Sequence, residues 1–445
     1  MGSTLVSADF ALDSGNTAWM MTSAAIVLMM TVPGLAFFYG GMVRSKSVLN
    51  MLVMNFVTVG TVGFIWVLYG YSMAFGNVTT GLGQFVDSPF TFFGLNNLTD
   101  DVGLGAATGV PALVDVGFQA TFAVITVALI SGAIADRIKF GSWVAFTVIW
   151  ATAIYFPLAH MVWGGGFLGV GGKVSTWLST PIDFAGGTVV HINAGAAGLA
   201  LVLLLGKRKG WPKEPIRPHN LPYVMLGAGL LWVGWFGFNA GSEGGADGTA
   251  GRAWINTFVA TCLAMLTWLI TEKVRDGHAT SLGAASGIVA GLVAITPAAA
   301  AVDTYGAIFI GAIAGVVCAL AVGLKFKFGF DDALDVVGVH LVGGITGTLL
   351  IGLFATNLQG GWYPDGAKNG LFYGGGLTQL ASQAVVAGFA ILFSFIGTLI
   401  IGFIIKAITG LRLSEDDEVN GIDLAVHGET AYETLGGTRV LTEVN

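Results

Sequence analysis

The chain alternates long apolar stretches with short polar segments, and eleven of those stretches are long enough to cross a membrane. An α-helix rises about 1.5 Å per residue, so about 20 apolar residues cross a hydrocarbon core of about 30 Å. The predicted spans are 17–41, 48–75, 112–135, 141–163, 184–206, 221–240, 252–272, 278–297, 303–324, 334–355 and 378–407. This pattern predicts an all-α polytopic membrane protein with eleven transmembrane helices.

The basic residues indicate how these spans are oriented. Lys and Arg favour cytoplasmic loops. With the N-terminus outside, every one of the 19 Lys and Arg residues except Lys173, Arg252 and Lys368 lies in an inner segment. The first sixteen residues contain Asp9 and Asp13 but no Lys or Arg, so we expect no cleaved secretory signal. The sequence therefore predicts an outer N-terminus and a cytoplasmic C-terminus.

The spans divide into two sets of five. One set falls in about 17–206 and the other in about 221–355, and a further helix follows at about 378–407. An odd number of spans per set makes the two sets antiparallel, which predicts an inverted repeat with its site at the repeat interface. We expect residues 1–407 to form one transmembrane domain and residues 408–445 to form a cytoplasmic tail.

Part of this tail has a pattern unlike that of a disordered segment. The stretch 421–432 mixes apolar and polar residues in a regular way after an acidic run at 415–418. We expect it to dock on the cytoplasmic face of the bundle.

Composition narrows the class of protein further. Hydrophobic residues make up 54% of the chain and charged residues 10%, and the 68 glycines suit close helix packing in a membrane. The net charge of −7 is spread over loops and tail, without a basic patch for nucleic acid. Cys262 and Cys318 lie in apolar runs and are interpreted as packing residues, not as a disulfide or metal pair. We expect no metal, no cofactor and no nucleic-acid partner.

Two histidines inside predicted spans are the strongest candidates for function. His191 follows Asp183, His340 follows Asp335, and each His has glycines at the fourth and seventh positions after it. An ionisable side chain within the bilayer is costly and is functional by default. A single such His could equally be a packing residue, but two in matching frames make that interpretation much weaker.

Aromatic residues and one hydroxyl gather at the predicted outer mouth. They come from the third, fourth and sixth predicted spans: Phe118, Phe122, Trp163, Trp235, Phe238 and Ser242. Such residues form ordinary interfacial belts in many membrane proteins. They also form cation sites, since an aromatic face attracts a cation by about 0.5–2 kcal/mol. Composition alone does not choose between the two.

An apolar interior with two neutral imidazoles limits what can cross. It would reject a hydrated ion because desolvation is costly, and it would accept a small neutral molecule that hydrogen-bonds to imidazole. Ammonium satisfies both the cation-attracting mouth and the apolar bore, because it can lose a proton. The two imidazoles could also pass a proton between them.

Long ordered stretches of the chain resemble the ammonium transporter (Amt/Mep/Rh) family, and its bacterial Amt branch in particular. The matching stretches are PGLAFFYGGMVRSKSVLN at 33–50, FQATFAVITVALISGAIADR at 118–137, MVWGGG at 161–166, DFAGGTVVHINAGAAGLALVLLLGKR at 183–208, WFGFNAGS at 235–242, DDALDVVGVHLVGG at 331–344 and GIDLAVHGETAYE at 421–433. The resemblance covers nearly the whole chain.

This resemblance implies an eleven-helix, inverted-repeat protomer in a plasma-membrane homotrimer, with one pore per protomer. The implied site residues are Phe118, Trp163 and Ser242 for ammonium recruitment, Phe122 and Phe238 for the gate, His191, His340 and Trp235 for the pore, and Asp183 as the essential acidic residue. The role of that aspartate lies in site architecture, electrostatics or deprotonation.

The resemblance also implies the partners. These are ammonium or ammonia, with methylammonium as a further candidate, the surrounding membrane lipid, and a PII-type signal protein at the cytoplasmic face. The stretch 167–182 is longer than in many relatives, so we expect an altered outer vestibule. The protein is expected to be a transporter and not an enzyme.

Three alternatives differ from ammonium transport. A neutral gas channel for NH3 or CO2 would carry no current, and the resemblance leaves open whether ammonia crosses alone or with a separate proton. A sensor would signal through the tail with little flux. A metal or redox enzyme would ligate an ion through His191 and His340, but CxxC, HExxH and haem-attachment patterns are absent from the sequence.

Overall fold

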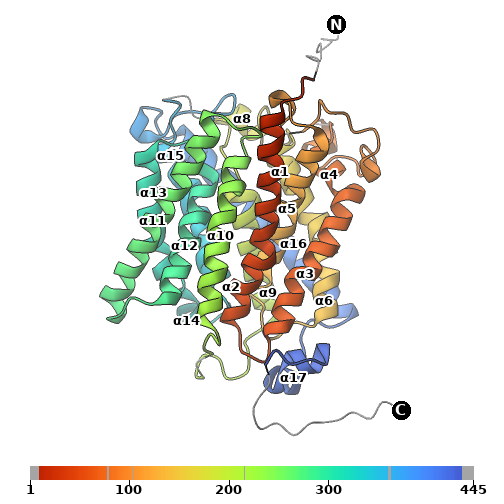
Figure 1. The fold of residues 1–445 in the computed structure, drawn as a ribbon, viewed down its shortest axis with the longest axis vertical. Coiled ribbons are helices and arrows are strands. Elements are labelled where there is room, and N and C mark those ends of the chain that lie inside the picture. The colour runs from red at the N-terminus through yellow and green to blue at the C-terminus, as the bar shows by residue number, and fades with distance from the viewer. Residues whose placement is uncertain (1–9, 78–79, 104, 215, 359–361, 433–445) are drawn as a thin grey trace.

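The computed structural model describes residues 10–432 except 78–79, 104, 215 and 359–361. These residues form an upright bundle of helices without a β-sheet, shown in Figure 1, and eleven helices are long and apolar enough to cross a membrane. The spans are Ser14–Met42 (α1, η1, α2), Val48–Phe75 (α3, η2, α4), Ala112–Ile130 (α5), Phe140–Trp163 (α6, η6, α7), Gly187–Leu205 (η7, α9), Leu221–Gly241 (α10), Gly248–Asp276 (α11), Ser281–Ala298 (α12, η8), Thr304–Phe328 (α13, α14), Val337–Phe354 (η9, α15) and Thr378–Ile408 (α16). The predicted fold class and the number of spans are confirmed.

The largest difference from the predicted boundaries is at the third span. This helix ends at Ile130, and residues 131–137 form turns instead of continuing to 135. Gly132 packs against the ring of Tyr39 so closely that a Cβ there would lie 2.5 Å from a ring carbon. The apolar residues 131–135 therefore lie outside the helix but remain buried.

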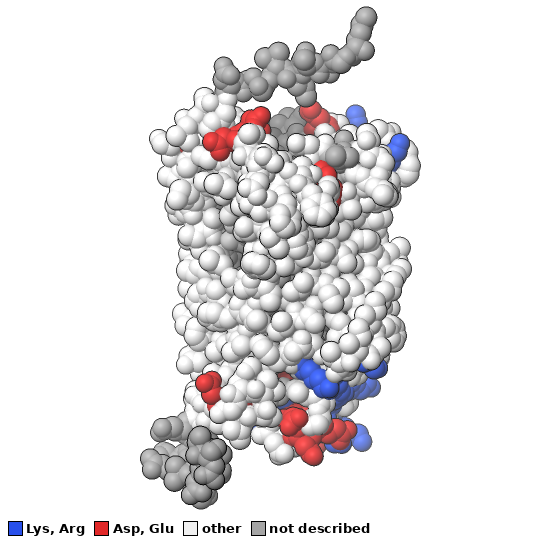
Figure 2. Space-filling view, turned by 90° about the vertical axis from the view of Figure 1, so that its right-hand side faces the viewer, with Lys and Arg blue, Asp and Glu red and all other residues white. Residues whose placement is uncertain are grey.

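On the face that Figure 2 shows, the charged side chains lie at the two ends of the bundle. Figure 2 shows a broad uncharged band between the ends, with most of the basic side chains in view gathered at the lower end. Such a band suits a hydrocarbon core of about 30 Å. Which end of the bundle faces the cytoplasm stays a prediction. Arg439, which the sequence places on the cytoplasmic side, is not among the described residues.

Two spans begin with a short π-helical segment and cross each other in the centre of the bundle. The segments are η7 (Gly187–Ile192), which leads into α9 (Asn193–Leu205), and η9 (Val337–Leu341), which leads into α15 (Val342–Phe354). A Cβ on Gly195 would lie 2.5 Å from the backbone nitrogen of Leu341, so only glycine permits this approach. π-Helical segments of this kind are frequent at functional sites.

A buried ionic cluster holds the lower ends of these helices. Arg208 follows α9 and donates to both carboxylate oxygens of Asp331, at 2.7 and 2.9 Å, while Arg137 lies 3.9 Å from the same carboxylate. Burial alone would raise the pKa of Asp331, but hydrogen bonds and the charge of Arg208 hold that pKa below its ordinary value. The cluster joins the ends of α5 and α9 to the start of η9.

The described part of the tail packs on this end of the bundle. The Asp423 carboxylate accepts from the backbone N–H groups of Leu49 (3.0 Å) and Asn50 (2.8 Å) and so caps α3. Glu418, in α17 (Glu415–Asn420), accepts from Arg412 at 2.6 Å. The stretch 421–432 docks on the bundle as expected, and that this end is the cytoplasmic one stays a prediction. Tail residues 433–445 lie outside the described residues.

Candidate functional site

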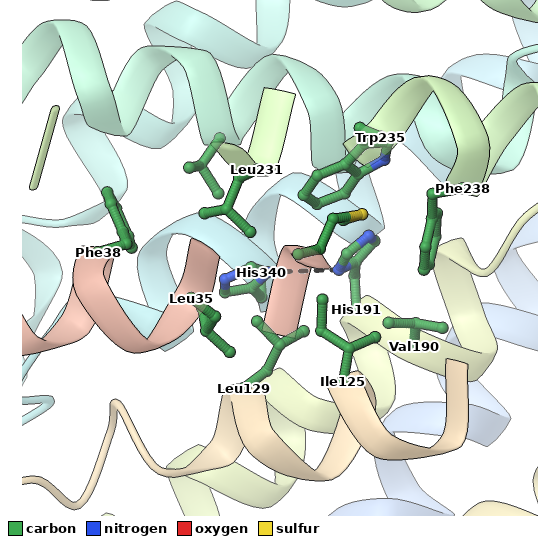
Figure 3. A pocket seen from close by; sticks show the side chains of 12 residues that line it. Leu35, Phe38, Ile125, Leu129, Val190, His191, Leu231, Trp235, Phe238 and His340 are labelled. Atoms are coloured by element: carbon green, nitrogen blue, oxygen red, sulfur yellow. Dashed lines mark hydrogen bonds between the residues drawn. The ribbon is translucent and has the colours of Figure 1, made fainter. Parts of the chain in front are cut away.

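A narrow cavity lies where the two π-helical segments meet. Its walls are apolar except for the imidazoles of His191 and His340, and Leu35, Leu231 and Trp235 are among the other residues that line it (Figure 3). Its volume is about 10 Å³. A water molecule needs at least about 10–15 Å³ by the same measure, so the cavity accommodates one small molecule at most.

The two histidines face each other across this cavity. Their Nδ1 atoms are 3.3 Å apart and their ring centroids 5.4 Å apart. A hydrogen bond between two Nδ1 atoms needs a proton on one and a lone pair on the other. In a neutral pair, the Nε2 atom of one ring is then a donor and the Nε2 atom of the other is an acceptor.

The ring of His191 is held by an indole and has an unused nitrogen. Trp235 stacks on it with centroids 5.4 Å apart and planes at 20°, and the Trp235 Nε1–H donates to Thr296 at 2.8 Å. Nε2 of His191 is buried and has no hydrogen-bond partner among the described residues. Buried polar atoms without partners are rare, and this one would suit a ligand that hydrogen-bonds.

Two phenyl rings separate this cavity from a wider one. Phe122 on α5 and Phe238 on α10 stack with centroids 4.0 Å apart and planes at 15°. Phe238 lines the narrow cavity and Phe122 lines the wider one, so the pair forms the wall between them. A molecule that passes from one cavity to the other has to displace these rings.

The wider cavity is a vestibule of about 550 Å³. Trp163 and Ser242 line it, and the Trp163 Nε1–H donates to the backbone carbonyl of Asp183 at 2.8 Å. Phe118, the third residue expected here, is fully buried behind Phe122, with ring centroids 4.9 Å apart. The structure thus brings all three expected recruitment residues to one region, with Phe118 behind its surface.

The Asp183 carboxylate is fully used as a helix cap. It accepts from the backbone N–H groups of Gly186 (2.9 Å), Gly187 (2.6 Å), Thr188 (2.9 Å) and Val189 (3.2 Å), and also from the Thr188 hydroxyl. These contacts satisfy the orphan donors at the start of η7 and fix where His191 lies.

The structural counterpart of Asp183 is Asp332. Asp332 accepts from the backbone N–H groups of Val336 (3.1 Å) and Val337 (2.7 Å) at the start of η9. Asp335, which the sequence comparison paired with Asp183, instead forms an ion pair of 2.6 Å with Lys325. The missed signal was the spacing, because Asp183 and Asp332 each lie eight positions before a histidine, whereas Asp335 lies five before.

Sequence reasoning also missed parts of the vestibule wall. Gln119, one residue after Phe118, lines the vestibule, and its Oε1 is buried without a partner among the described residues. Trp362 also lines it, from a loop that carries no pattern in the sequence. Val170 and Pro181 belong to the stretch 167–182 and form part of the wall, and the expected alteration of the vestibule by this stretch stays a prediction.

Comparison with known proteins assigns this architecture to a family. The sequence profile of the Ammonium Transporter Family matches residues 18–432. The chain belongs to the ammonium transporter family. Ammonium transport through a multi-pass membrane protein is therefore its function.

Individual relatives agree with this assignment. The chain is 55% identical to the ammonium transporter of Mycobacterium bovis over 441 residues, which cover 95% of this chain and 91% of that protein. Among solved structures, Mep2 of Candida albicans matches with a TM-score of 0.81 and 32% identity over 91% of this chain and 88% of that one. A structure described as a sensor Amt protein matches with a TM-score of 0.81 and 28% identity over 93% and 98% of the two chains.

Proposed function

We propose that this transporter binds ammonium in the vestibule, removes a proton from it at the phenyl gate, and conducts ammonia past His191 and His340. The observation that carries the proposal is the order of the two cavities. A wide vestibule with polar groups is separated by stacked phenyl rings from a narrow apolar cavity that contains only two imidazoles as polar groups. The first suits a hydrated cation and the second suits a small neutral molecule.

Recruitment would use an aromatic face and a hydroxyl. Trp163 offers its ring to the vestibule, and its orientation is held by the hydrogen bond to Asp183. A cation–π contact contributes about 0.5–2 kcal/mol. Phe118 supports the site from behind Phe122, and Ser242 adds an oxygen, although its Oγ–H already donates to the carbonyl of Phe238 at 2.8 Å.

Deprotonation follows from the difference between the two cavities. Moving an isolated ammonium-sized ion from water into an apolar site costs far more free energy than the recruitment contacts contribute. Ammonium would therefore lose its proton before it enters the narrow cavity. Phe122 and Phe238 form the gate where this change would occur. Whether the proton then returns to the vestibule or crosses separately decides between neutral and charge-coupled transport.

The histidine pair would replace water around ammonia. Ammonia needs both donors and acceptors, and the Nε2 atoms of a neutral His191–His340 pair supply one of each. Trp235 holds the His191 ring in place. Asp183 would act as the essential acidic residue through architecture, because its carboxylate already accepts five donors.

The cellular arrangement is proposed from the family and the charge pattern. We infer a homotrimer in the plasma membrane, with the N-terminus outside and the tail of residues 408–445 in the cytoplasm. Residues 1–407 form the transmembrane domain, with inverted repeats at about 17–206 and 221–355. A PII-type signal protein at the basic end and methylammonium as a second substrate belong to the same proposal.

The test is ammonium-evoked current in liposomes on a solid-supported membrane, with potassium as the control ion. We expect a saturable ammonium current without a potassium response. A variant with both His191→Leu and His340→Leu should lose this selective transport, while His278→Leu, at an exposed position, should keep it. Full selective transport by the double variant would contradict the role of the pair.

Two other outcomes identify the alternatives. Internal alkalinisation without current would mean that neutral ammonia crosses alone. Neither signal from folded protein would contradict transport and favour a sensor, which the similarity to a sensor Amt protein makes the second candidate function.

A further inference from the structure

A buried stretch of irregular backbone leads from the vestibule into η7. Residues 179–186 have no regular secondary structure, and all of them are buried. Pro181 and Asp183 in this stretch line the vestibule, and η7 begins directly after it, at Gly187. A buried backbone N–H or C=O needs a hydrogen-bond partner, and here the helix ladder does not supply one. The groups that pair with this backbone therefore determine where the vestibule wall lies.

Several of these partners come from one face of α16, the eleventh span. The Ser382 hydroxyl donates to the carbonyl oxygen of Ser179 at 2.6 Å, and Nε2 of Gln379 donates to that of Thr180 at 3.0 Å. Ser382 and Gln383 lie three and four positions after Gln379, so the three side chains share a helix face. None of them is more than 1% exposed. The first turns of α16 thus bind the irregular stretch through its backbone.

Gln383 holds Ile182 by both of its backbone groups. The Gln383 Oε1 accepts from the N–H of Ile182 at 2.8 Å, and Nε2 donates to the carbonyl oxygen of the same residue at 2.8 Å. Nε2 also donates to the carbonyl of Thr348 at 3.2 Å, and Oε1 also accepts from Gln379 at 3.2 Å. An amide side chain has two N–H donors and two acceptor lone pairs. Gln383 therefore uses its full hydrogen-bonding capacity.

This contact lies one residue away from the group that orients the recruitment indole. Ile182 stands between Pro181 and Asp183, which both line the vestibule. The carbonyl of Asp183 accepts from Nε1 of Trp163 at 2.8 Å. A displacement of Ile182 would therefore move the vestibule wall and the acceptor that holds the Trp163 ring.

Gln383 also connects the two segments that carry the pore histidines. It binds the stretch before η7, which contains His191, and it binds Thr348 on α15, eight positions after His340. The two segments are in close contact here, because a Cβ on Gly187 would lie 2.8 Å from the hydroxyl oxygen of Thr348. α16 carries neither histidine, yet one of its side chains binds next to both of their segments.

The same helix offers a comparison that does not involve this stretch. The Thr398 hydroxyl accepts from Nε1 of Trp150 at 2.8 Å, and both residues are fully buried. Thr398 lies fifteen positions after Gln383, which is about four helical turns. A change at Thr398 removes a buried hydrogen bond of α16 without reaching the vestibule.

We propose that Gln383 is a positioning residue for the ammonium-binding vestibule. Its amide holds the backbone of Ile182, and through that backbone it fixes the ring of Trp163 and the wall at Pro181 and Asp183. The predicted effect on transport rests on the proposed function, whereas the contact itself is measurable without transport. Gln383 acts on ammonium through the backbone and not by touching it.

The first test is NMR of the indole N–H groups in the full-length protein, labelled with ¹⁵N-tryptophan, in nanodiscs. The chain has twelve tryptophans, and Trp163→Phe and Trp150→Phe identify the two signals needed. We expect Gln383→Leu to shift the signal of Trp163 and to leave that of Trp150 in place. Thr398→Val should do the reverse. A Trp163 signal that stays in place in Gln383→Leu, or that moves equally in Thr398→Val, would overturn the proposal.

The second test measures the ammonium current per amount of folded protein. Gln383→Leu keeps the size of the side chain but removes its four hydrogen bonds. We expect the half-saturating ammonium concentration to rise at least about threefold while the maximal current changes by less than about twofold. Thr398→Val should leave both values unchanged. If Gln383→Leu does not fold, Gln383→Asn, which keeps the amide but is one methylene shorter, is measured against the same two criteria.

The results separate this inference from the function it builds on. Equal loss of maximal current and affinity, or no change in either, would overturn the positioning role. A wild-type protein without ammonium current would refute the proposed function, whereas the NMR result on Trp163 would stand or fall independently.

Discussion

Replacing Asp183 by Asn is expected to stop transport by destabilising the start of η7. The carboxylate accepts from four backbone N–H groups, those of Gly186, Gly187, Thr188 and Val189, and from the Thr188 hydroxyl. An Asn side chain keeps one acceptor oxygen and presents an amide N–H₂ where the other oxygen was. That N–H₂ then faces backbone N–H donors.

The size of the effect follows from the number of donors left without an acceptor. Oδ2 accepts from the N–H groups of Thr188 and Val189, and Oδ1 accepts from those of Gly186 and Gly187. Asn at 183 can satisfy one of these pairs and leaves the other pair buried. Each unsatisfied buried donor costs about 1–3 kcal/mol, so the total loss is about 2–6 kcal/mol.

The assay compares thermal unfolding and ammonium current for the same purified protein. Asp183→Asn should lower the unfolding temperature by several degrees and abolish the current. Asp247→Asn is the matched control, because Asp247 caps α11 (Gly248–Asp276) by accepting from Thr249 (2.8 Å) and Ala250 (3.0 Å) at an exposed position. It should cost less stability, since water replaces its lost hydrogen bonds, and it should leave the maximal current at saturating ammonium intact.

One result would refute this reasoning. If Asp183→Asn unfolded at the wild-type temperature and yet carried no current, the cap would be dispensable. The carboxylate would then act on ammonium directly, by its charge or as a proton acceptor.

Three further predictions concern the ends of the bundle. Burial and the charge of Asp247 raise the pKa of Glu243 to about 7, so this neighbour of Ser242 should ionise between pH 6 and 8. The half-saturating ammonium concentration should fall by about threefold over that range, and Glu243→Gln should make it constant. Arg208→Met removes both side-chain hydrogen bonds to the buried Asp331 carboxylate, leaves it with Arg137 at 3.9 Å, and should cost about 3–5 kcal/mol in thermal unfolding. Because Arg208 holds the pKa of Asp331 below its ordinary value, the ion pair stabilises the fold above about pH 4, and the difference should shrink as the pH falls further. Asp423→Asn weakens the cap on α3 by about 1 kcal/mol and should speed proteolysis of the tail, and an unchanged rate would contradict the docking.

Much of the fold could be predicted because the bilayer imposes one simple rule on the sequence. A membrane span needs a continuous apolar run of known length, and this chain separates its runs by short polar segments. The same rule made His191 and His340 stand out, since ionisable residues are rare within such runs. The third span shows the limit of the rule. Residues 131–135 are apolar enough to continue the helix, but they form turns, with Gly132 packed against Tyr39.

The parts of the site that sequence reasoning missed depend on contacts between distant segments. The burial of Phe118 behind Phe122 follows from how α5 packs, not from the spacing of the two residues on one helix face. His160 also lies in a predicted span, 141–163, but it lacks the matched frame that singled out His191 and His340. Its two carbonyl partners, Ala74 and Gly83, lie 86 and 77 positions away in the chain, and no local pattern indicates them.

The same spacing of eight residues between a capping aspartate and a histidine occurs in two antiparallel spans. Asp183 and Asp332 each cap a helix eight positions before a histidine. The helix that begins after Asp183 ends near Arg208, which binds Asp331 next to Asp332, so the two caps lie at opposite ends of antiparallel spans. Eight residues at about 1.5 Å each place each histidine about 12 Å along the helix axis from its cap, well inside the bundle. The measured separation of the ring centroids is 5.4 Å. The fixed spacing from a local cap therefore sets the depth of each histidine, and the close packing of Gly195 against Leu341 brings the two rings together.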